Sequence, residues 1–265
     1  NFSSCIQMTS LSPWISRSNT MFTLDPSNSL SRATAYKFKI TTGVKDIAGN
    51  TLNSKYETPN GIFTLWTIQS GTTSEDTANA VTTDSSGNLY VAGYTKGVLE
   101  GDTNSGMSDL ILIKYNSQGT IQWTKQLGTL EDDQANGVTT DSSGNIYVTG
   151  WTGGGLDGNT SSGHEDIFLI KYNSSGTKLW TKQLGSASYD QAYGVTTDTS
   201  GDLYITGYAW KLDGQDSVGR FDYFIVKYNS SGTKQWSRLF GTSEQDFGYA
   251  IATDSSNNVL VAGTT

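Results

Sequence analysis

Short apolar segments, separated by turns rich in Gly, Asn, Asp and Ser, recur along the chain. NIYVTGWT (145–152) alternates apolar and polar residues, and DIFLIKYN (166–173) is almost continuously apolar with β-branched and aromatic side chains, which is typical of strands. TKLWTKQL (177–184) alternates more weakly, as an outer strand would. Because no segment shows a 3.6-residue apolar period, the pattern predicts an all-β chain without substantial helix.

The strand pattern is a repeat whose period is marked by tryptophan. The marking residues, spaced by 57, 57 and 56 positions, are Trp66, Trp123, Trp180 and Trp236. Counted from each Trp, Gly recurs at +5 and Asp at +10 and +18. Units of four short antiparallel strands, repeated at such a period, are typical of β-propeller blades. The expected elements are an outer strand over 62–69, three complete blades over about 77–127, 134–184 and 191–240, and a partial blade over 247–265.

The repeated residues also carry a family resemblance. The motif D-x-A-x-G-V-x-T-D-x-x-G-N-[IL]-Y, followed by D-[IL]-[FL]-[LI]-[IV]-K-Y, resembles the bacterial SBBP β-propeller repeat family from Trp66 to Thr265. The resemblance implies a ring of about seven blades in a secreted or surface protein. Since the repeats form about half of such a ring, we expect that the sequence is cut off or that another chain completes it.

Residues 1–61 lack the blade motif. The alternating strand and G-V-x-D-x-A-G-N turn within TAYKFKITTGVKDIAGNTL (34–52) resemble an S-layer-type bacterial Ig-like domain. Such a sandwich needs about seven strands, and the pattern here predicts about four, so a truncated sandwich is expected. Cys5 has two interpretations that the sequence leaves open, a disulfide partner in the missing part or a buried unpaired thiol.

Charge and composition exclude several classes of protein. The 265 residues include 17 Lys or Arg and 25 Asp or Glu, a net charge of −8, which argues against nucleic-acid binding. No apolar run approaches the roughly 18 residues of a membrane helix, and the single Cys and single His exclude Cys/His zinc cages. No signal-peptide pattern is present. The family resemblance therefore favours an extracellular or outer-surface location with a signal or lipid anchor upstream of residue 1.

Propeller topology predicts which face binds. The link between the second and third strands of a blade lies at the same end as the link to the next blade, and the two short hairpins lie at the other end. Variable loops on a rigid scaffold commonly carry function. The candidate loops are 96–108, 153–165 and 210–221, with the inter-blade links around Glu75, Glu131, Tyr189 and Glu244.

Acidic residues are expected to gather on this face, seventeen of them against three basic ones, a formal −14. A field of one sign steers oppositely charged partners, so we expect a protein or glycan partner with basic chemistry, and no cofactor. The candidate ligand-binding residues are Glu75, Asp76, Asp102, Asp109, Asp132, Asp133, Asp157, His164, Asp166, Asp190, Asp213, Asp216, Asp222 and Asp246.

Two kinds of chemistry compete with simple binding. The favoured prediction contains no metal, but the oxygen-rich long loops leave a Ca²⁺ site at Asp157 and Asp166 as an alternative, although the EF-hand pattern is missing. His164 as a general base, or Asp132 with Asp133 as a carboxylate pair, suits glycoside hydrolysis. The sequence thus favours a non-enzymatic surface or secreted binding, adhesion or scaffold protein; the alternative is a carbohydrate-active propeller, a glycoside hydrolase or lyase.

Overall fold

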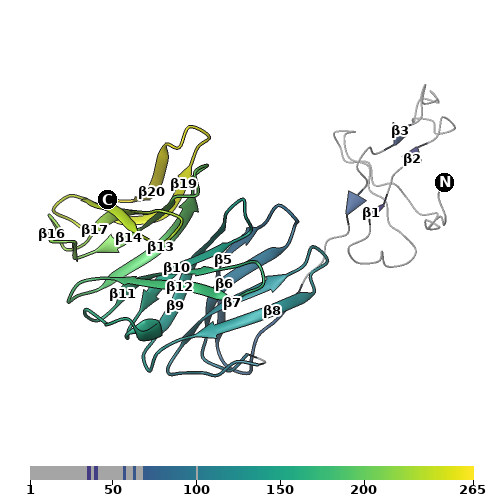
Figure 1. The fold of residues 1–265 in the computed structure, drawn as a ribbon, viewed down its shortest axis with the longest axis horizontal. Helices are drawn as coiled ribbons and strands as arrows, with labels where there is room; N and C mark the ends of the chain where they lie inside the picture. Colours follow the sequence, from purple (N-terminus) through teal and green to yellow (C-terminus); the bar gives the residue numbers. More distant parts are fainter. Residues whose placement is uncertain (1–34, 37–38, 41–55, 58–61, 64–67, 100) are drawn as a thin grey trace, which may run out of the picture. The chain divides into compact units, whose positions relative to one another are not determined.

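The computed structural model describes eight residues of the N-terminal segment (35–36, 39–40, 56–57 and 62–63) together with 68–99 and 101–265 (Figure 1). The chain divides into two compact units, Asn1–Ile68 and Gln69–Thr265. The described strands of the first unit form two antiparallel pairs: β1 (Ala35–Tyr36) with β4 (Ile62–Phe63), and β2 (Lys39–Ile40) with β3 (Tyr56–Glu57). Cys5 and most of the predicted Ig-like segment lie outside the described residues.

The start of the predicted outer propeller strand, 62–69, takes a different partner. Its first residues form β4, which pairs with β1, and 64–67 lie outside the described residues. The alternating pattern of GIFTL suits any edge strand, so it does not specify which sheet the segment joins.

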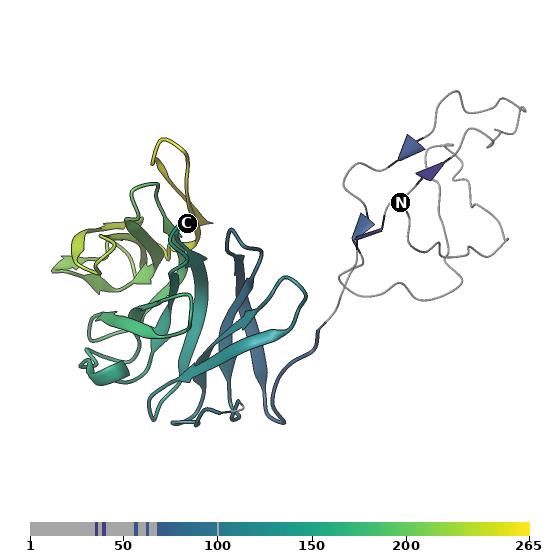
Figure 2. The ribbon, with the colours of Figure 1, turned by 45° about the vertical axis from the view of Figure 1, so that its right-hand side comes forward.

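Apart from a small two-stranded hairpin in the third long loop, the second unit consists of three four-stranded antiparallel sheets and one two-stranded sheet, each in chain order from inner to outer strand (Figures 1 and 2). The first sheet contains β5 (Asp76–Thr83), β6 (Leu89–Thr95), β7 (Asp109–Tyr115) and β8 (Ile121–Leu127). The second contains β9 (Asp133–Thr140), β10 (Ile146–Thr152), β11 (Asp166–Tyr172) and β12 (Lys178–Leu184). The third contains β13 (Asp190–Thr197), β14 (Leu203–Ala209), β17 (Asp222–Tyr228) and β18 (Lys234–Phe240), and the two-stranded sheet contains β19 (Phe247–Thr253) and β20 (Val259–Thr264).

The predicted fold class, an all-β chain with three complete propeller blades, is confirmed. Among the described residues the one helical element is the 3₁₀ turn η1 (Leu156–Gly158), and no described helix has the length and apolarity required to cross a membrane. A small hairpin, β15 (Lys211–Leu212) with β16 (Gln215–Asp216), lies in the third long loop. The sequence pattern did not predict this hairpin.

The core lies between neighbouring blades, and β11 shows why its sequence is continuously apolar. Phe168 and Ile170 pack with the first blade, whereas Ile167 and Leu169 pack with the third. Because successive side chains of a strand point to opposite faces, a middle blade covered on both sides needs apolar residues at every position.

The inner strands β5, β9, β13 and β19 are joined by two kinds of side-chain hydrogen bond that repeat from blade to blade. Thr140 Oγ1 donates to the carbonyl oxygen of Thr83 (3.1 Å), and Thr253 Oγ1 donates to that of Thr197 (2.8 Å). Asn136 Nδ2 donates to the carbonyl oxygen of Ala192 (3.0 Å). These bonds satisfy polar groups along the innermost strands, where neighbouring blades approach each other.

The short hairpins lie together at one end of each blade. An added Cβ at Gly144, in the DSSGN turn, would lie 3.7 Å from Ser174 Cβ, in the NSSGT turn. Asp141 organises the first turn by accepting hydrogen bonds from Ser143 N (2.9 Å), Asn145 N (2.9 Å) and Tyr147 Oη (2.9 Å). Burial alone would raise the pKa of Asp141, but hydrogen bonds from Asn145 and Tyr147 outweigh it and hold that pKa below its usual value. Asp141 therefore has a structural role in this turn.

Candidate binding site

The opposite end of each blade carries the long loops and the links between blades. Ser108, before β7, forms a parallel bridge with Asp132, before β9. The Asp133 N–H donates to the Ser108 carbonyl (2.7 Å), and the Gly153 N–H donates to the Asp132 carbonyl (2.8 Å). The same bridge recurs as Glu165 with Tyr189 and Phe221 with Gln245. The predicted long-loop face therefore exists, built on backbone pairing.

The tips of the long loops, however, fold back along the outer half of each blade. Leu156 is fully buried, and its N–H donates to Gln183 Oε1 (2.9 Å). Asp157 consequently lies beside β12, where it accepts hydrogen bonds from Lys178 Nζ (2.5 Å) and Thr181 Oγ1 (2.7 Å). The prediction that Asp157 belongs to the binding face is wrong, because burial of the preceding leucine pulls the loop away from that face.

The other two long loops depart from the prediction in the same way. Leu99 and Leu212 are buried; Asp102 accepts a hydrogen bond from Thr124 Oγ1 (3.3 Å), and Asp213 pairs with Lys234. Asp216 forms an ion pair with Lys211 (2.7 Å) within the small hairpin. A repeated signal was available in the sequence, since leucine precedes an acidic residue and glycine in VLEGD, GLDGN and KLDGQ.

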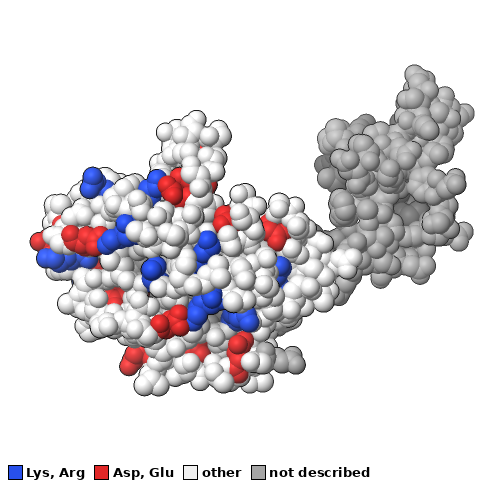
Figure 3. Space-filling view, viewed as in Figure 1, with Lys and Arg blue, Asp and Glu red and all other residues white. Residues whose placement is uncertain are grey.

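Several of the predicted ligand-binding residues are not accessible to a partner. Six of the predicted ligand-binding residues are at most 1% exposed: Asp109, Asp133, Asp166, Asp190, Asp222 and Asp246. Their carboxylates accept hydrogen bonds from nearby backbone, as Asp166 does from Ser162 N (2.6 Å), and Asp76 accepts one from Thr72 N (2.6 Å) at the start of β5. The accessible charge of the face is therefore much less negative than the expected −14. On the side shown in Figure 3, acidic and basic side chains are interspersed.

Asp133, one of the residues considered for catalysis, is held entirely by protein groups. Its Oδ2 accepts from Thr129 N (2.5 Å) and Thr129 Oγ1 (3.0 Å), and its Oδ1 accepts from Thr152 Oγ1. Burial raises the pKa of Asp133 to about 6, against hydrogen bonds that lower it and with a further contribution from Asp109. The Asp133 carboxyl does not face a substrate.

The alternative Ca²⁺ site would have required Asp157 and Asp166 to lie together. Asp157 contacts Lys178, at the start of β12, whereas Asp166 lies next to Gly185, just after the end of that strand. The seven residues of β12 separate the two carboxylates. Within the described part of the chain, no group of three or more His, Cys, Asp or Glu side chains could hold a metal ion.

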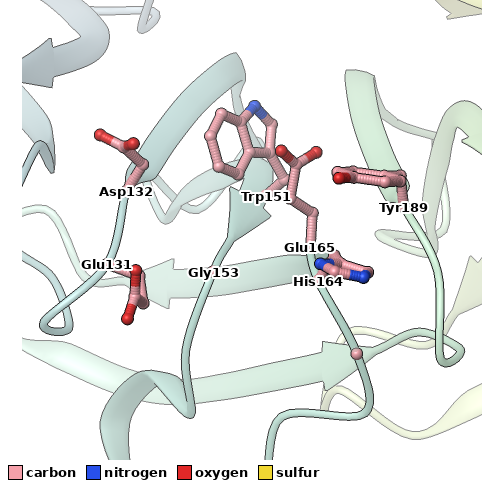
Figure 4. Close-up of a pocket in the computed structure, with 8 residues that line it drawn as sticks. Glu131, Asp132, Trp151, Gly153, His164, Glu165 and Tyr189 are labelled. Carbon is pink, nitrogen blue, oxygen red and sulfur yellow. The ribbon is translucent and has the colours of Figure 1, made fainter.

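A hollow of about 340 Å³ lies on the long-loop face at the end of β10 (Figure 4). Its lining comes from the links before β9 and β13, from the end of β10 and from the segment before β11: Glu131, Asp132, Trp151, Gly153, Gly163, His164, Glu165 and Tyr189. The His164 ring stacks on the Tyr189 ring, with centroids 4.9 Å apart and an interplanar angle of 7°. Trp151 stands between Asp132 and Tyr189 in the close-up (Figure 4).

The hollow contains carboxylates that no cation neutralises. Within the described residues, no Lys or Arg forms an ion pair with Glu131, Asp132 or Glu165. Glu165 accepts a hydrogen bond from Gln191 Nε2. Burial raises the pKa of Glu165, and the negative charge of Asp132 adds to this effect. A cation entering the hollow would relieve this repulsion.

The corresponding positions of the neighbouring blades are closed or neutralised. In the first blade, Glu75 is paired with Lys96 (2.7 Å) and accepts a hydrogen bond from Tyr94 Oη (2.9 Å). In the third blade, the ring of Phe221, at the position of Glu165, lies 4.9 Å from that of Tyr208. The open acidic hollow is thus a property of the second blade rather than of the repeat.

Sequence reasoning located part of this hollow. Asp132 and His164 were predicted as ligand-binding residues, and the structure brings them together. Glu131 and Tyr189 mark two of the predicted inter-blade links, and Glu165 ends the predicted loop 153–165, although none of the three was in the predicted set of ligand-binding residues. The available signal was departure from the repeat, because Glu165 stands where the other blades have Ser108 and Phe221.

Comparison with known proteins agrees with this architecture. Bacterial Ig-like domain sequences match residues 5–67. An uncharacterized WD repeat-containing protein of Acanthamoeba polyphaga mimivirus is 27% identical over 59% of this chain and 14% of its own length. The regulatory protein FlaEY of Caulobacter vibrioides is 27% identical over 69% of this chain and 20% of its own. The chain spans about a fifth or less of these relatives.

A protein of unknown function from Bacteroides caccae has a solved structure that aligns with 81% of this chain and 58% of its own, with a TM-score of 0.43 and 13% identity. The Beta-propeller repeat family model (SBBP) matches four segments, 65–100, 122–157, 179–211 and 235–265. Together these matches cover about half of the chain. Each contains the first two strands of one sheet, and the last three begin in the outer strand of the sheet before. The chain therefore belongs to the β-propeller repeat family.

Proposed function

We propose that this chain is a non-enzymatic binding or scaffold protein of the bacterial surface or secreted fraction, and that its second-blade hollow receives a basic side chain of a protein partner. Membership of a propeller repeat family supports a binding or scaffold role. The observation that carries the proposal is the set of three carboxylates without an ion-pair partner, next to exposed aromatic rings.

The chemistry of the hollow fits a guanidinium group. Arginine forms bidentate hydrogen bonds to carboxylates and stacks on aromatic faces, and the hollow offers Asp132, Glu165 and the face of Trp151 within one space (Figure 4). An ammonium group also gains from carboxylates and aromatic faces, but without the planar fork. We therefore propose an arginine-bearing partner, with adhesion as its biological outcome.

Binding of a fluorescent hexa-arginine peptide, followed by anisotropy, tests this proposal. The double variant Asp132→Asn/Glu165→Gln is expected to weaken affinity at least about 10-fold, because hydrogen bonds to charged groups contribute about 1.5–3 kcal/mol each. The matched control is Asp157→Asn/Asp213→Asn. It removes two charges that lie beside the outer strands, away from the hollow, and should bind like the unaltered chain. Equal losses in both double variants would mean that net charge, and not the hollow, attracts the peptide.

Salt supplies a second test of the same proposal. Raising ionic strength from about 0.05 M to about 0.5 M is expected to weaken peptide binding severalfold, because screening shortens the range of the acidic field. Salt-independent binding would contradict an electrostatic hollow. A neutral glycan that binds the chain, and whose binding survives Asp132→Asn/Glu165→Gln, would favour the glycan partner instead.

The absence of enzymatic activity is also proposed, and it rests on the position of Asp133. That carboxyl accepts its hydrogen bonds from Thr129 and Thr152 inside the protein, so the Asp132–Asp133 pair is not arranged to act on a glycosidic bond. Incubation with a polysaccharide panel is expected to release no reducing ends. Release that disappears in His164→Ala would support the carbohydrate-active alternative.

A further inference from the structure

Beneath the long-loop face, each junction between blades contains two buried carboxyl groups. One opens the third strand of a blade and the other opens the first strand of the next blade. The pairs are Asp109 with Asp133, Asp166 with Asp190, and Asp222 with Asp246, and every member is at most 1% exposed. Two buried carboxylates at one junction repel each other unless something between them compensates.

The first junction brings the two groups to the same point. A Cβ at Gly128 would lie 2.0 Å from Asp109 Oδ1 and 3.0 Å from Asp133 Oδ2. Asp109 Oδ2 accepts hydrogen bonds from Ser105 N (2.9 Å) and Gln126 Nε2 (2.9 Å). Asp109 Oδ1, by contrast, is buried and has no hydrogen-bond partner. The oxygen without a donor, Asp109 Oδ1, is thus the one that lies near Gly128 together with Asp133 Oδ2.

The second junction shares the orphaned oxygen, and the pKa of Asp190 is raised, chiefly by burial and further by the charge of Asp166. Asp166 Oδ2 accepts from Ser162 N (2.6 Å) and Gln183 Nε2 (2.8 Å), and Asp166 Oδ1 is buried without a partner. Asp190 Oδ2 accepts from Ser186 N (2.5 Å), and its Oδ1 accepts from Trp210 N (3.0 Å). The acceptor without a donor therefore recurs at the same repeat position.

The groups that face the first pair are uncharged, so a bound proton is the simplest way to offset the repulsion between Asp109 and Asp133. They are neutral donors from β8 (Gln126), from the first long loop (Ser105), from the link before β9 (Thr129) and from the end of β10 (Thr152). The one charge that acts on Asp133 is that of Asp109. An oxygen cage for Ca²⁺ would need six to eight ligands, and the two carboxyls do not supply them.

We propose that Asp109 with Asp133, and Asp166 with Asp190, each bind one proton from solvent, held as a carboxyl-to-carboxylate hydrogen bond that fastens neighbouring blades together. The bound proton gives the orphaned oxygen a partner and removes one of the two buried charges. Burial also raises the pKa of Asp133 to about 6 and raises that of Asp190, which agrees with proton binding near neutral pH.

The third junction provides an internal contrast. Asp222 Oδ1 accepts a hydrogen bond from Gly219 N (3.4 Å), and Asp222 Oδ2 accepts one from Val218 N (3.0 Å). The pKa of Asp246 is lowered, chiefly by the hydrogen bond from Thr242 N. The two carboxyls converge here as well, since a Cβ at Gly241 would lie 2.5 Å from Asp222 Oδ1 and 2.7 Å from Asp246 Oδ2. Here backbone donors to both Asp222 oxygens stabilise the ionised form, so the junction has no orphaned oxygen and does not require a proton.

The proposal predicts how stability depends on pH. A carboxyl whose pKa rises from 3.8 unfolded to about 6 folded stabilises the fold fully below the unfolded value, and its contribution is lost as pH rises through about 6. Urea unfolding of the full chain at about pH 4.5 and about pH 7.5 should reveal a loss of about 25-fold in the folding equilibrium constant at this junction.

Asp109→Asn is the decisive variant. Its amide nitrogen takes the place of the orphaned oxygen and donates to Asp133 without a titrating proton. The difference of about 25-fold between the two pH values should therefore disappear, and stability at about pH 7.5 should equal or exceed that of the unaltered chain. In Asp133→Asn the amide nitrogen must replace an oxygen that accepts from Thr129 or from Thr152, so a donor loses its acceptor and this variant should be less stable than Asp109→Asn. Asp222→Asn, at the third junction, should leave the pH dependence unchanged.

Three results would overturn the proposal. The first is an unchanged pH dependence of stability in Asp109→Asn. The second is a pH dependence that excess EDTA or Ca²⁺ alters, which would indicate a metal ion. The third is loss of the same pH dependence in Asp222→Asn. If the Asn variants do not fold, carbon-13 NMR of the carboxyl groups in the unaltered chain decides. A titration midpoint near pH 6 for Asp133 supports the shared proton, and a midpoint at the unperturbed value of about 3.9 contradicts it.

Discussion

Replacing Gly150 by alanine is expected to lower the free energy of unfolding by more than about 3 kcal/mol. β9 and β10 shift register between Thr149 and Gly150, and at this bulge an added Cβ would lie 1.9 Å from the carbonyl oxygen of Gln134. Because the clashing atom belongs to the backbone of β9, the clash can be removed only by shifting this innermost strand against its neighbouring blade. Urea denaturation monitored by tryptophan fluorescence measures the loss.

Gly158→Ala is the matched control for that substitution. Gly158 has φ +80°, and a Cβ there would meet nothing within 4 Å. Alanine should therefore cost only the conformational penalty of a left-handed residue, about 1–2 kcal/mol. If the two variants lose the same stability, the close approach at the bulge is not what requires glycine at position 150.

The second large effect is expected for Asp141→Ala, with a loss of about 2–4 kcal/mol in the free energy of unfolding. The substitution leaves the buried Tyr147 hydroxyl and the backbone N–H groups of Ser143 and Asn145 without their acceptor. Because hydrogen bonding holds the folded pKa of Asp141 below 3.8, its contribution is present above that pH and is lost as pH falls through the lower folded value. Thermal denaturation at neutral and acidic pH should show the variant and the unaltered chain converging in acid.

Asp254→Ala provides the comparison within the same molecule. Asp254 accepts the equivalent bonds from Ser256 N (2.8 Å) and Asn258 N (2.8 Å), but Leu260 occupies the position of the buried tyrosine. The turn is exposed, so water replaces the lost acceptor and the cost should be about 1 kcal/mol. A larger loss at Asp254 than at Asp141 would contradict the importance given to the buried hydroxyl.

The repeat made the blades predictable. A tryptophan every 56 or 57 residues establishes the register, and a continuously apolar strand such as DIFLIKYN indicates burial on both faces. The Asp–Gly turns could also be predicted, since their hydrogen bonds span only two to six residues. Local chemistry repeated several times is therefore sufficient for the sheet architecture.

The binding face was less predictable because its properties depend on contacts distant in sequence. Charge alone does not distinguish Asp132, in the hollow, from Asp133, which is buried beside Gly128. The leucine repeated in each long loop indicates an anchor, but the pattern does not show that Leu156 is buried on the core and that Asp157 lies beside the outer strand β12. The hollow itself needs links and loops from two blades, and so required the structure.

The repeated bonds between inner strands have an evolutionary consequence. Asn79 donates to the carbonyl oxygen of Ala135 exactly as Asn136 donates to that of Ala192, and both bonds join residues 56 positions apart. A threonine bond recurs at all three junctions, from Thr140 to Thr83, from Thr197 to Thr140 and from Thr253 to Thr197. Since these donors and acceptors are shared by the repeats, duplication of one unit in the gene creates junctions that are already compatible. Recombination between gene segments that encode these similar repeats can thus alter blade number without new interface mutations, while each copy remains free to diverge in its loops.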